Sequence, residues 1–302
     1  MKWYLDLINR TLDEGVWVDN KRTGQSCLTI INADFEYDCA SDIPPLLLSK
    51  KVNYRAAFAE VLGYLRGYTN AEQFRALGTH TWDANANENE SWLNNPHREG
   101  KDDMGIVYGA TALMWPGYDQ AIDALNPVIE KILQHEDDRG LIITFWNPAV
   151  FEYGCLRPCL HTWHFSILNE ELHLTTYQRS ADIPLGLPFN LLQGYFLVRV
   201  LAHIAGLKPG NLYMKFVNLH IYENQLRGVM EQLKRKPVSV KYTNYQLPKG
   251  KEMGCIAPIP VLPKFHIAEE VKTFDDLMSC PITAFQIEDY HPQPFIKFPF
   301  SV

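Results

Sequence analysis

The chain has 302 residues, of which 46% are apolar and 12% aromatic, so it can bury a large core as one large domain or two small ones. Its net charge of −7 argues against broad electrostatic binding to nucleic acid or to an anionic membrane, because no basic block offsets the acidic balance. No apolar run approaches the roughly 20 residues that span a bilayer, and the start lacks the apolar core of a signal peptide. We therefore expect one cytoplasmic domain over residues 1–302, with no membrane partner and no requirement for nucleic acid.

Two segments of the N-terminal third have helical periodicity. Apolar residues recur at helical spacing over 2–15 and 53–66, which predicts two amphipathic helices. The stretch 84–104 is polar and rich in turn formers, so it is typical of a surface insertion.

Strand patterns dominate the rest of the chain. The expected strands are 141–147, 161–168, 171–178, 212–222 and 238–243. Asn169 and Glu170 suit a hairpin turn, helical spacing returns over 191–206, and a proline-rich stretch lies at 258–263. This order of elements favours the α+β class, with helices layered on a mixed sheet.

The six cysteines are scattered without the tight spacing of a small secreted scaffold, which predicts reduced thiols. Free cysteine is usually a buried packing residue, and this is the interpretation for Cys27, Cys39, Cys255 and Cys280. Cys155 and Cys159 stand in a more informative context.

The segments 156–160 and 176–190 carry the chemistry. Cys159 is a candidate nucleophile, because a thiolate attacks electron-poor carbon well and cationic neighbours such as Arg157 and Arg179 favour its ionised form. Arg179 presents a fork of donors that suits a phosphate. Asn190 has a donor and an acceptor on one amide, so it can pair with a base edge that carries N–H next to C=O. Together they indicate a nucleotide pocket.

Two generic alternatives to a nucleotide pocket are a zinc site and a cysteine hydrolase. Cys155, Cys159, His161 and His164 are metal-ligating types, but alternation along a strand puts Cys159 and His161 on one face and His164 on the other, which disfavours a closed zinc site. A cysteine hydrolase would pair Cys159 with His161 or His220. The context of Arg179 and Asn190 favours nucleotide chemistry over both.

The order of these motifs resembles the thymidylate synthase family, and the resemblance covers essentially the whole chain. The matching segments are Arg22-Thr23-Gly24, Glu60, Thr81-Trp82-Asp83, Val107-Tyr108-Gly109, Pro158-Cys159, Gln178-Arg179-Ser180-x-Asp182, Leu185-Gly186-x-Pro188-Phe189-Asn190, His220-x-Tyr222, and Tyr290-x-Pro292-x-Pro294 with Val302 at the end. The resemblance implies a large mixed sheet with layered helices that packs on its twin in a homodimer.

The implied activity is reductive methylation of dUMP to dTMP with 5,10-methylenetetrahydrofolate as co-substrate and without a metal. By resemblance, Cys159 adds to C6 of the uracil ring, and C5 then takes the one-carbon unit. The alternative outcome is a dUMP hydroxymethylase, in which water instead of hydride reaches the one-carbon unit and 5-hydroxymethyl-dUMP forms. A catalytically silent nucleotide- or RNA-binding protein is a third possibility.

The resemblance also implies roles for the substrate contacts. Arg22, Arg179 and Ser180 correspond to the phosphate clamp, and Arg139 to an arginine that reaches the phosphate from the partner subunit, so that the active site is shared. Asn190 corresponds to the residue that reads uracil, and His220 and Tyr222 to the pair that binds the sugar 3′-hydroxyl.

The remaining implied roles concern proton movement and the folate. Glu60 corresponds to the general acid/base and Tyr108 to the residue that orders the water that removes the C5 proton. The folate contacts are Trp82, Asp182, Phe189 and Val302.

Several positions depart from the usual family pattern. Gly140 replaces a second arginine, Leu160 follows the nucleophile where His is common, and Asn85 stands where many members have a second tryptophan. Asn218 replaces an Asp, and the Gln-Trp-Arg that usually follows Tyr108-Gly109 is missing. These differences surround the pocket and keep the hydroxymethylase alternative open.

Overall fold

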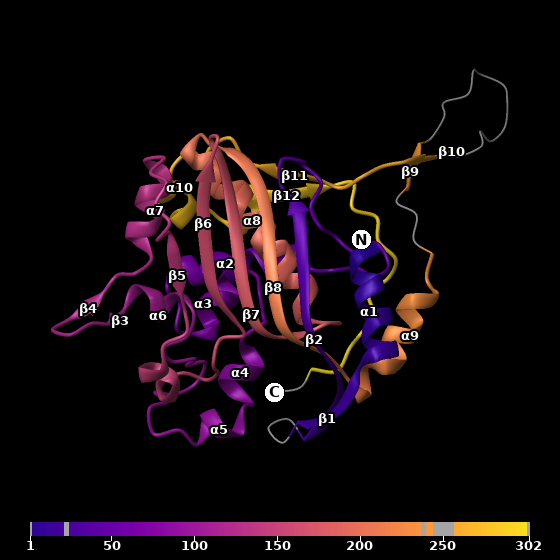
Figure 1. Ribbon diagram of the computed structural model, residues 1–302, viewed down its shortest axis with the longest axis horizontal. Coiled ribbons are helices and arrows are strands. Elements are labelled where there is room, and N and C mark those ends of the chain that lie inside the picture. Colours follow the sequence, from indigo (N-terminus) through magenta and orange to yellow (C-terminus); the bar gives the residue numbers. More distant parts are fainter. Residues whose placement is uncertain (1, 21–23, 237–239, 244–256, 301–302) are drawn as a thin grey trace.

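A computed structural model describes residues 2–20, 24–236, 240–243 and 257–300. Its central element is a six-stranded sheet in the order β1-β2-β8-β7-β6-β5 (Figure 1). The strands are β1 (Val16–Asn20), β2 (Gln25–Asp38), β5 (Ile142–Thr144), β6 (Leu160–Leu168), β7 (Glu171–Asp182) and β8 (Lys208–Tyr222). β7 and β8 are parallel and the other neighbours antiparallel, so the predicted mixed sheet is confirmed.

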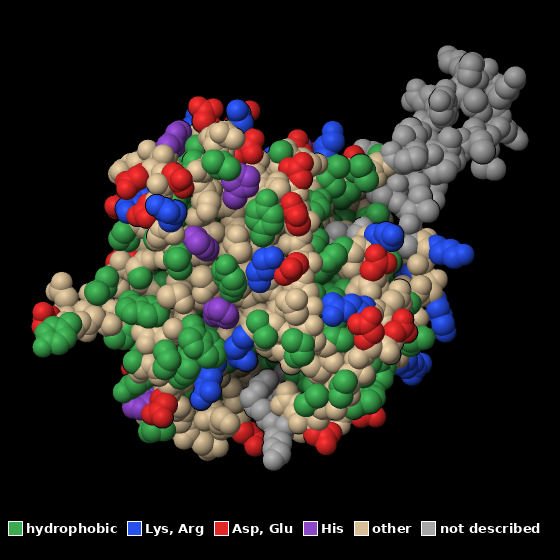
Figure 2. Space-filling view, viewed as in Figure 1, with side chains coloured by type: hydrophobic (Ala, Val, Ile, Leu, Met, Phe, Trp, Pro, Cys, Tyr) green, Lys and Arg blue, Asp and Glu red, His purple; other side chains and the backbone are tan. Residues whose placement is uncertain are grey.

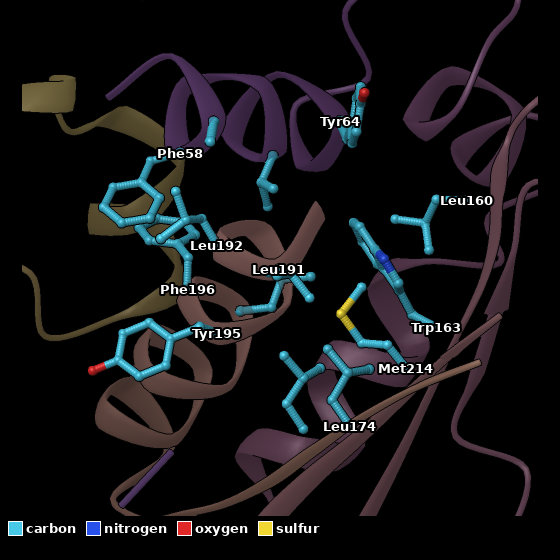
Figure 3. Close-up of a cluster of buried hydrophobic side chains, with 14 of the residues drawn as sticks. Phe58, Tyr64, Leu160, Trp163, Leu174, Leu191, Leu192, Tyr195, Phe196 and Met214 are labelled. Carbon is cyan, nitrogen blue, oxygen red and sulfur yellow. The ribbon is translucent and has the colours of Figure 1, made fainter. Parts of the chain in front are cut away.

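Two helices, α2 (Tyr54–Leu65) and α8 (Gly186–Ala205), lie behind the sheet as Figure 1 is viewed. α8 is apolar nearly all round, as expected for a helix buried between layers, and it ends at Gly206, whose φ of 69° is left-handed. Figure 3 shows Phe58 of α2 beside Phe196 of α8, and Trp163 and Met214 of the sheet facing Leu191. This core fixes α2 and α8 relative to the ends of β6 and β7.

The other described elements lie around this core or, like the pairs β3–β4 and β9–β10, project away from it (Figure 1). The helices are α1 (Lys2–Glu14), α3 (Ala71–Ala76), α4 (Asp83–Asn87), α5 (Glu90–Leu93), α6 (Gly109–Leu113), α7 (Asn126–Leu133), α9 (Leu226–Lys234) and α10 (Phe274–Ser279). The short strands are β3 (Trp115–Pro116), β4 (Ala121–Ile122), β9 (Val240–Thr243), β10 (Ala257–Pro260), β11 (Lys264–Ile267) and β12 (Phe285–Glu288).

Most predicted elements are present. The helices expected over 2–15 and 53–66 are α1 and α2, and the hairpin turn between β6 and β7 is confirmed, with positive φ at Asn169 (52°) and Glu170 (62°). Two consecutive left-handed residues are what a tight hairpin turn requires. The strand expected over 238–243 is described only as β9, because 238 and 239 lie outside the described residues.

Two expectations need correction. The stretch 84–104 is more than a surface insertion, because it forms α4 and α5 and buries Ala86, Trp92 and Met104; the indole of Trp92 donates to the Asp103 carbonyl at 2.7 Å. Over 141–147 only Ile142–Thr144 is strand.

Other findings bear on the broader expectations. Cys27, Cys39 and Cys280 are buried and free, as the packing interpretation expected, whereas Cys255 lies outside the described residues. None of the helices in the described ranges is long and apolar enough to span a membrane.

Gly109, the residue after Tyr108, packs closely against α2. A Cβ added to Gly109 would lie 1.5 Å from the Tyr64 carbonyl oxygen, so α6 can approach α2 only because this residue has no side chain. We expect Gly109→Ala to lower the free energy of unfolding by about 1–3 kcal/mol or more, the usual cost of overpacking. Denaturant unfolding checks this, with Gly186→Ala as control because nothing there would lie closer than 3.9 Å. Equal stability of the two variants would contradict the packing argument.

Candidate active site

Cys159 opens onto a cavity of about 990 Å³ at the ends of β6 and β7. It lies directly before β6, is only partly buried, and shares the cavity wall with Arg179, Ser180, Asp182, His220 and Tyr222. This volume is near the upper end of the range for small-molecule sites, about 300–1,000 Å³. The structure therefore gathers the thiol and five other residues of the predicted site around one space.

Arg179 braces the segment that carries the thiol. Its Nε donates to the Pro158 carbonyl at 2.9 Å, and its Nη2 donates to the Arg157 carbonyl at 2.9 Å and lies 3.7 Å from Cys159 Sγ. The Arg179 backbone N–H also donates to the Cys159 carbonyl at 2.9 Å. The guanidinium thus holds the nucleophile loop and places positive charge beside the sulfur.

Tyr108 also contacts the segment that carries Cys159. The Cys159 backbone N–H donates to its hydroxyl oxygen at 3.2 Å, and its ring stacks on Tyr64 with centroids 4.4 Å apart. Its φ of 44° is left-handed, which is rare for a bulky residue and is held here by α6 directly after it. Burial raises the pKa of Tyr108 far above its usual value, so this phenol stays protonated.

A continuous series of side-chain amides connects β7 of the sheet to α2. Gln178 Nε2 donates to Asn190 Oδ1 at 2.9 Å, Asn190 Nδ2 donates to Gln193 Oε1 at 3.0 Å, and Gln193 Nε2 donates to Glu60 Oε2. We call Gln178, Asn190 and Gln193 the amide chain. It connects two predicted site residues, Asn190 and Glu60, through a glutamine that had no assigned role.

Glu60 lies partly buried at the end of the amide chain. Burial is the main cause that raises the pKa of its carboxyl, and contacts with Thr81, Gln193, Tyr64 and Trp82 oppose the rise. A carboxyl with a raised pKa is suited to accept and return protons near neutral pH. The surroundings of Glu60 therefore agree with the acid/base role expected of it.

Asp182 ends β7 on the cavity wall. Its Oδ1 accepts from the Leu185 N–H at 2.9 Å and its Oδ2 from Gln225 Nε2 at 2.8 Å. Burial raises the pKa of Asp182 to about 6, against the effect of these bonds and of the Lys50 charge. Burial also lowers the pKa of Lys50 to about 7, and its ammonium donates to the Pro184 carbonyl.

His220 and Tyr222 stand at the end of β8 on the cavity wall, and His220 is the register partner of Asp182. Their rings meet edge to face at 5.0 Å, and His220 Nδ1 lies 3.1 Å from Asn218 Oδ1. Both are buried, so each presents only a small polar surface to the cavity. Asn218, one of the departures from the usual family pattern, therefore orients the imidazole.

The structure does not place every predicted residue on the cavity. Trp82 is only 3% exposed and packs edge-on against Tyr108, and Phe189 packs partly buried against the core. Arg139 is exposed on the loop before β5, where its carbonyl contacts His164, and it does not line the cavity. Arg22 and Val302 lie outside the described residues.

The generic alternatives gain no support from the geometry. Across the described ranges, no three His, Cys, Asp or Glu side chains come together in a way that could hold a metal ion. His161 Nδ1 contacts the Thr162 hydroxyl at 3.0 Å, and burial followed by the Arg179 charge lowers the pKa of the imidazole.

Sequence reasoning missed Gln193, Lys50, Gln225 and Tyr64 as members of the site. Gln193 stands one helical turn after Asn190, so its proximity follows from the helix spacing once α8 is known. Lys50 and Gln225 meet Asp182 from distant segments, for which local sequence patterns carry no signal.

Comparison with known proteins agrees with this site. The thymidylate synthase family profile matches residues 2–302. The chain belongs to the thymidylate synthase family. Relatives named thymidylate synthase from Idiomarina loihiensis, Pasteurella multocida and Vibrio parahaemolyticus are 49%, 48% and 47% identical, each over the full length of both chains. Family membership thus holds for the whole chain, including the regions where the usual motifs are altered.

Proposed function

We propose that this member of the thymidylate synthase family converts dUMP to dTMP with 5,10-methylenetetrahydrofolate, using Cys159 as nucleophile. The observation that carries the proposal is the juxtaposition of Cys159 Sγ with Arg179 on a cavity large enough for more than one ligand. The amide chain adds a neutral hydrogen-bonding group for a base, the Asn190 carboxamide, which is bonded to Gln178, the residue before Arg179. Full-length relatives named thymidylate synthase support the same reaction.

The first chemical step follows from the position of the thiol. Cys159 Sγ forms a bond to C6 of the uracil ring, the C5–C6 π electrons move toward C5 and O4, and C5 becomes a carbon nucleophile. A carboxyl near O4 can supply or remove a proton as charge develops there, and we assign this role to Glu60, whose pKa is raised mainly by burial. Once C5 has bonded to the one-carbon unit, its proton leaves to water ordered by Tyr108, whose hydroxyl already contacts the Cys159 backbone.

Binding of dUMP is assigned to groups around the same cavity. Arg179 and Ser180, with Arg22, are proposed to hold the phosphate, and His220 with Tyr222 the 3′-hydroxyl. Asn190 is proposed to pair with N3–H and O4 of the base. Each part of dUMP is thus assigned a suitable partner: the carboxamide for the neutral base, the His-Tyr pair for the sugar hydroxyl, and arginine with serine for the phosphate dianion.

The residues present fit a reduced folate as co-substrate. Asp182 has a carboxyl whose pKa of about 6 lets it accept hydrogen bonds from pterin N–H groups near neutral pH. Trp82 and Phe189 do not line the cavity but pack against Tyr108 and the core, and their folate contacts are part of the proposal. When bound, the folate supplies the one-carbon unit and the hydride, while the chain positions it and excludes water.

A homodimer through the open face of the sheet is part of the proposal. The face toward the viewer in Figure 1 carries no helix among the described elements, and Figure 2 shows hydrophobic side chains spread across it. Tyr177 and Val217 share this face of β7 and β8 and are 40% and 56% exposed, which is unusual for large apolar side chains of neighbouring strands. A second copy would cover them by isologous packing and could bring Arg139 toward the phosphate.

The reaction is tested by supplying dUMP and 5,10-methylenetetrahydrofolate and following both products. Formation of dihydrofolate by absorbance, with dTMP by mass, would support the proposal. A product of 5-hydroxymethyl-dUMP without dihydrofolate would replace it by the hydroxymethylase. Binding of dUMP without any turnover would indicate a silent binding protein.

Trp82 is expected to influence which product forms. It packs against Tyr108 and contacts the surroundings of Glu60, so a smaller ring should admit water near the reacting one-carbon unit. We expect Trp82→Phe to slow dTMP formation about tenfold, the scale of one misplaced packing contact near the chemistry, and to divert part of the product to 5-hydroxymethyl-dUMP. Mass analysis of the nucleotides measures this. Slowing of both products in equal proportion would mean that Trp82 does not control the outcome.

A further inference from the structure

The amide chain has acceptors of fixed identity at both ends. Gln178 Nε2 donates to the Ser180 backbone carbonyl at 3.0 Å as well as to Asn190, and a carbonyl can only accept. At the other end, ionised Glu60 can only accept from Gln193. All three NH₂ groups therefore donate in one direction along the chain: Gln178 to Asn190 as well as to Ser180, Asn190 to Gln193, and Gln193 to Glu60.

Reversal of any single amide would break this order. A reversed Asn190 would face Gln178 Nε2 with its own NH₂ group and Gln193 Oε1 with its own oxygen. Gln178 and Gln193 are 2% and 1% exposed, so water has little access to separate the opposed groups. A buried polar group left unpaired in this way is strongly disfavoured.

The orientation of Asn190 decides which pyrimidine it matches. After bonding to its neighbours, the amide has one N–H and one oxygen lone pair left for a ligand. Uracil offers an acceptor at O4 beside a donor at N3, whereas cytosine offers a donor at N4 beside an acceptor at N3. The two bases therefore require opposite orientations of the same carboxamide.

We infer that Gln193 is a specificity-determining residue that holds the Asn190 carboxamide in the uracil-reading orientation and so excludes cytosine nucleotides. It occupies the position one turn after Asn190 on α8 and bonds to both Asn190 and Glu60. The inference rests on the proposed function, because it assigns Asn190 to the base. Gln193 is a positioning residue, since it acts through Asn190.

The test measures binding of dUMP and of dCMP to the folded protein by calorimetry, without folate and without turnover. Gln193→Met keeps the size of the side chain but removes both hydrogen bonds, and we expect the preference for dUMP to fall about tenfold or more, the scale of one buried hydrogen bond. Gln232→Met is the matched control. Gln232 is also fully buried, but its amide donates to Ser49 at 2.8 Å and does not touch the amide chain, so the preference should stay unchanged.

A second variant keeps the inference testable if Gln193→Met does not fold. Gln193→Glu retains an acceptor for Asn190 Nδ2 and places a carboxyl against Glu60, where two carboxyls share a proton. We expect the dUMP preference to stay within about threefold of the wild type, while the pH profile of turnover shifts.

The possible results distinguish a failure of the proposed function from a failure of the role assigned to Gln193. A wild-type protein that binds neither nucleotide overturns the proposed function. A wild type that prefers dUMP, together with Gln193→Met that keeps the full preference, overturns the role of Gln193 alone. Loss of the preference in Gln193→Glu would also overturn that role, because this variant keeps the acceptor that orients Asn190.

Discussion

Replacement of Cys159 by Ala should reduce kcat about 10⁴-fold or more, the scale for loss of a covalent nucleophile, while dUMP still binds. In the proposed mechanism the thiol forms the bond to C6, whereas Arg179, Ser180 and Asn190 bind the nucleotide, and the bonds of Arg179 to Pro158 and of Asn190 to Gln178 do not involve the thiol. Steady-state assay gives the first quantity and calorimetry with dUMP the second.

Cys155→Ala is the matched control for this variant. Cys155 lies four residues earlier and lines the same cavity, but its thiol is buried and burial raises its pKa to about 12. It should therefore stay a thiol at neutral pH, and its removal should change kcat little. Substantial turnover by Cys159→Ala, or an equal loss in Cys155→Ala, would reject Cys159 as the nucleophile.

Mixed dimers should recover activity that neither parent variant has. If the partner's Arg139 completes each site, a heterodimer of Cys159→Ala and Arg139→Glu subunits has one site with both defects and one with neither. Random exchange of equal amounts should then restore about a quarter of the wild-type sites. The exposed position of Arg139, away from the cavity of its own subunit, is the structural reason to expect this.

The measurement is turnover before and after the two variants are mixed under conditions that allow subunits to exchange. A mixture of each variant with itself, treated in the same way, is the control. Subunit exchange shown by native mass spectrometry without any gain in turnover would contradict a site shared between subunits.

Local patterns in the sequence predict those parts of the fold that local forces decide. Asn169 is a residue type that adopts left-handed backbone readily, and the hairpin turn that it begins with Glu170 is therefore indicated by the local sequence. The apolar spacing of 53–66 is likewise sufficient for α2.

The long strand β2 was missed because its burial does not alternate throughout. Before Asn32, whose φ is 63°, the four consecutive residues 27–30 are all buried, whereas after it only Ala33 and Phe35 are buried in alternation. The stretch 84–104 was misjudged for a different reason. Its composition is polar, but the few apolar side chains in it, above all Trp92, are fully buried against partners that tertiary folding supplies.

The candidate site likewise contains residues that a sequence motif can indicate and residues that only tertiary contacts reveal. Cys159, Arg179, Ser180 and Asp182 lie close in sequence on segments that adjoining strands bring together, so a motif can indicate them. Gln193 became significant only through its contacts with Asn190 and Glu60. Those contacts depend on how α8 faces α2, which no short motif encodes.

The bracing role of Arg179 affects how substitutions at this residue are to be interpreted. Its Nε and Nη2 donate hydrogen bonds to the carbonyls of Pro158 and Arg157. A change to Lys or Ala would therefore remove the hydrogen bonds that hold the loop together with the proposed phosphate donor. A fall in turnover could then arise from a displaced thiol even where nucleotide affinity is preserved. Chemical-modification rates of Cys159 in the nucleotide-free protein would tell these two causes apart, and without them an arginine scan of this pocket would overstate the contribution of charge.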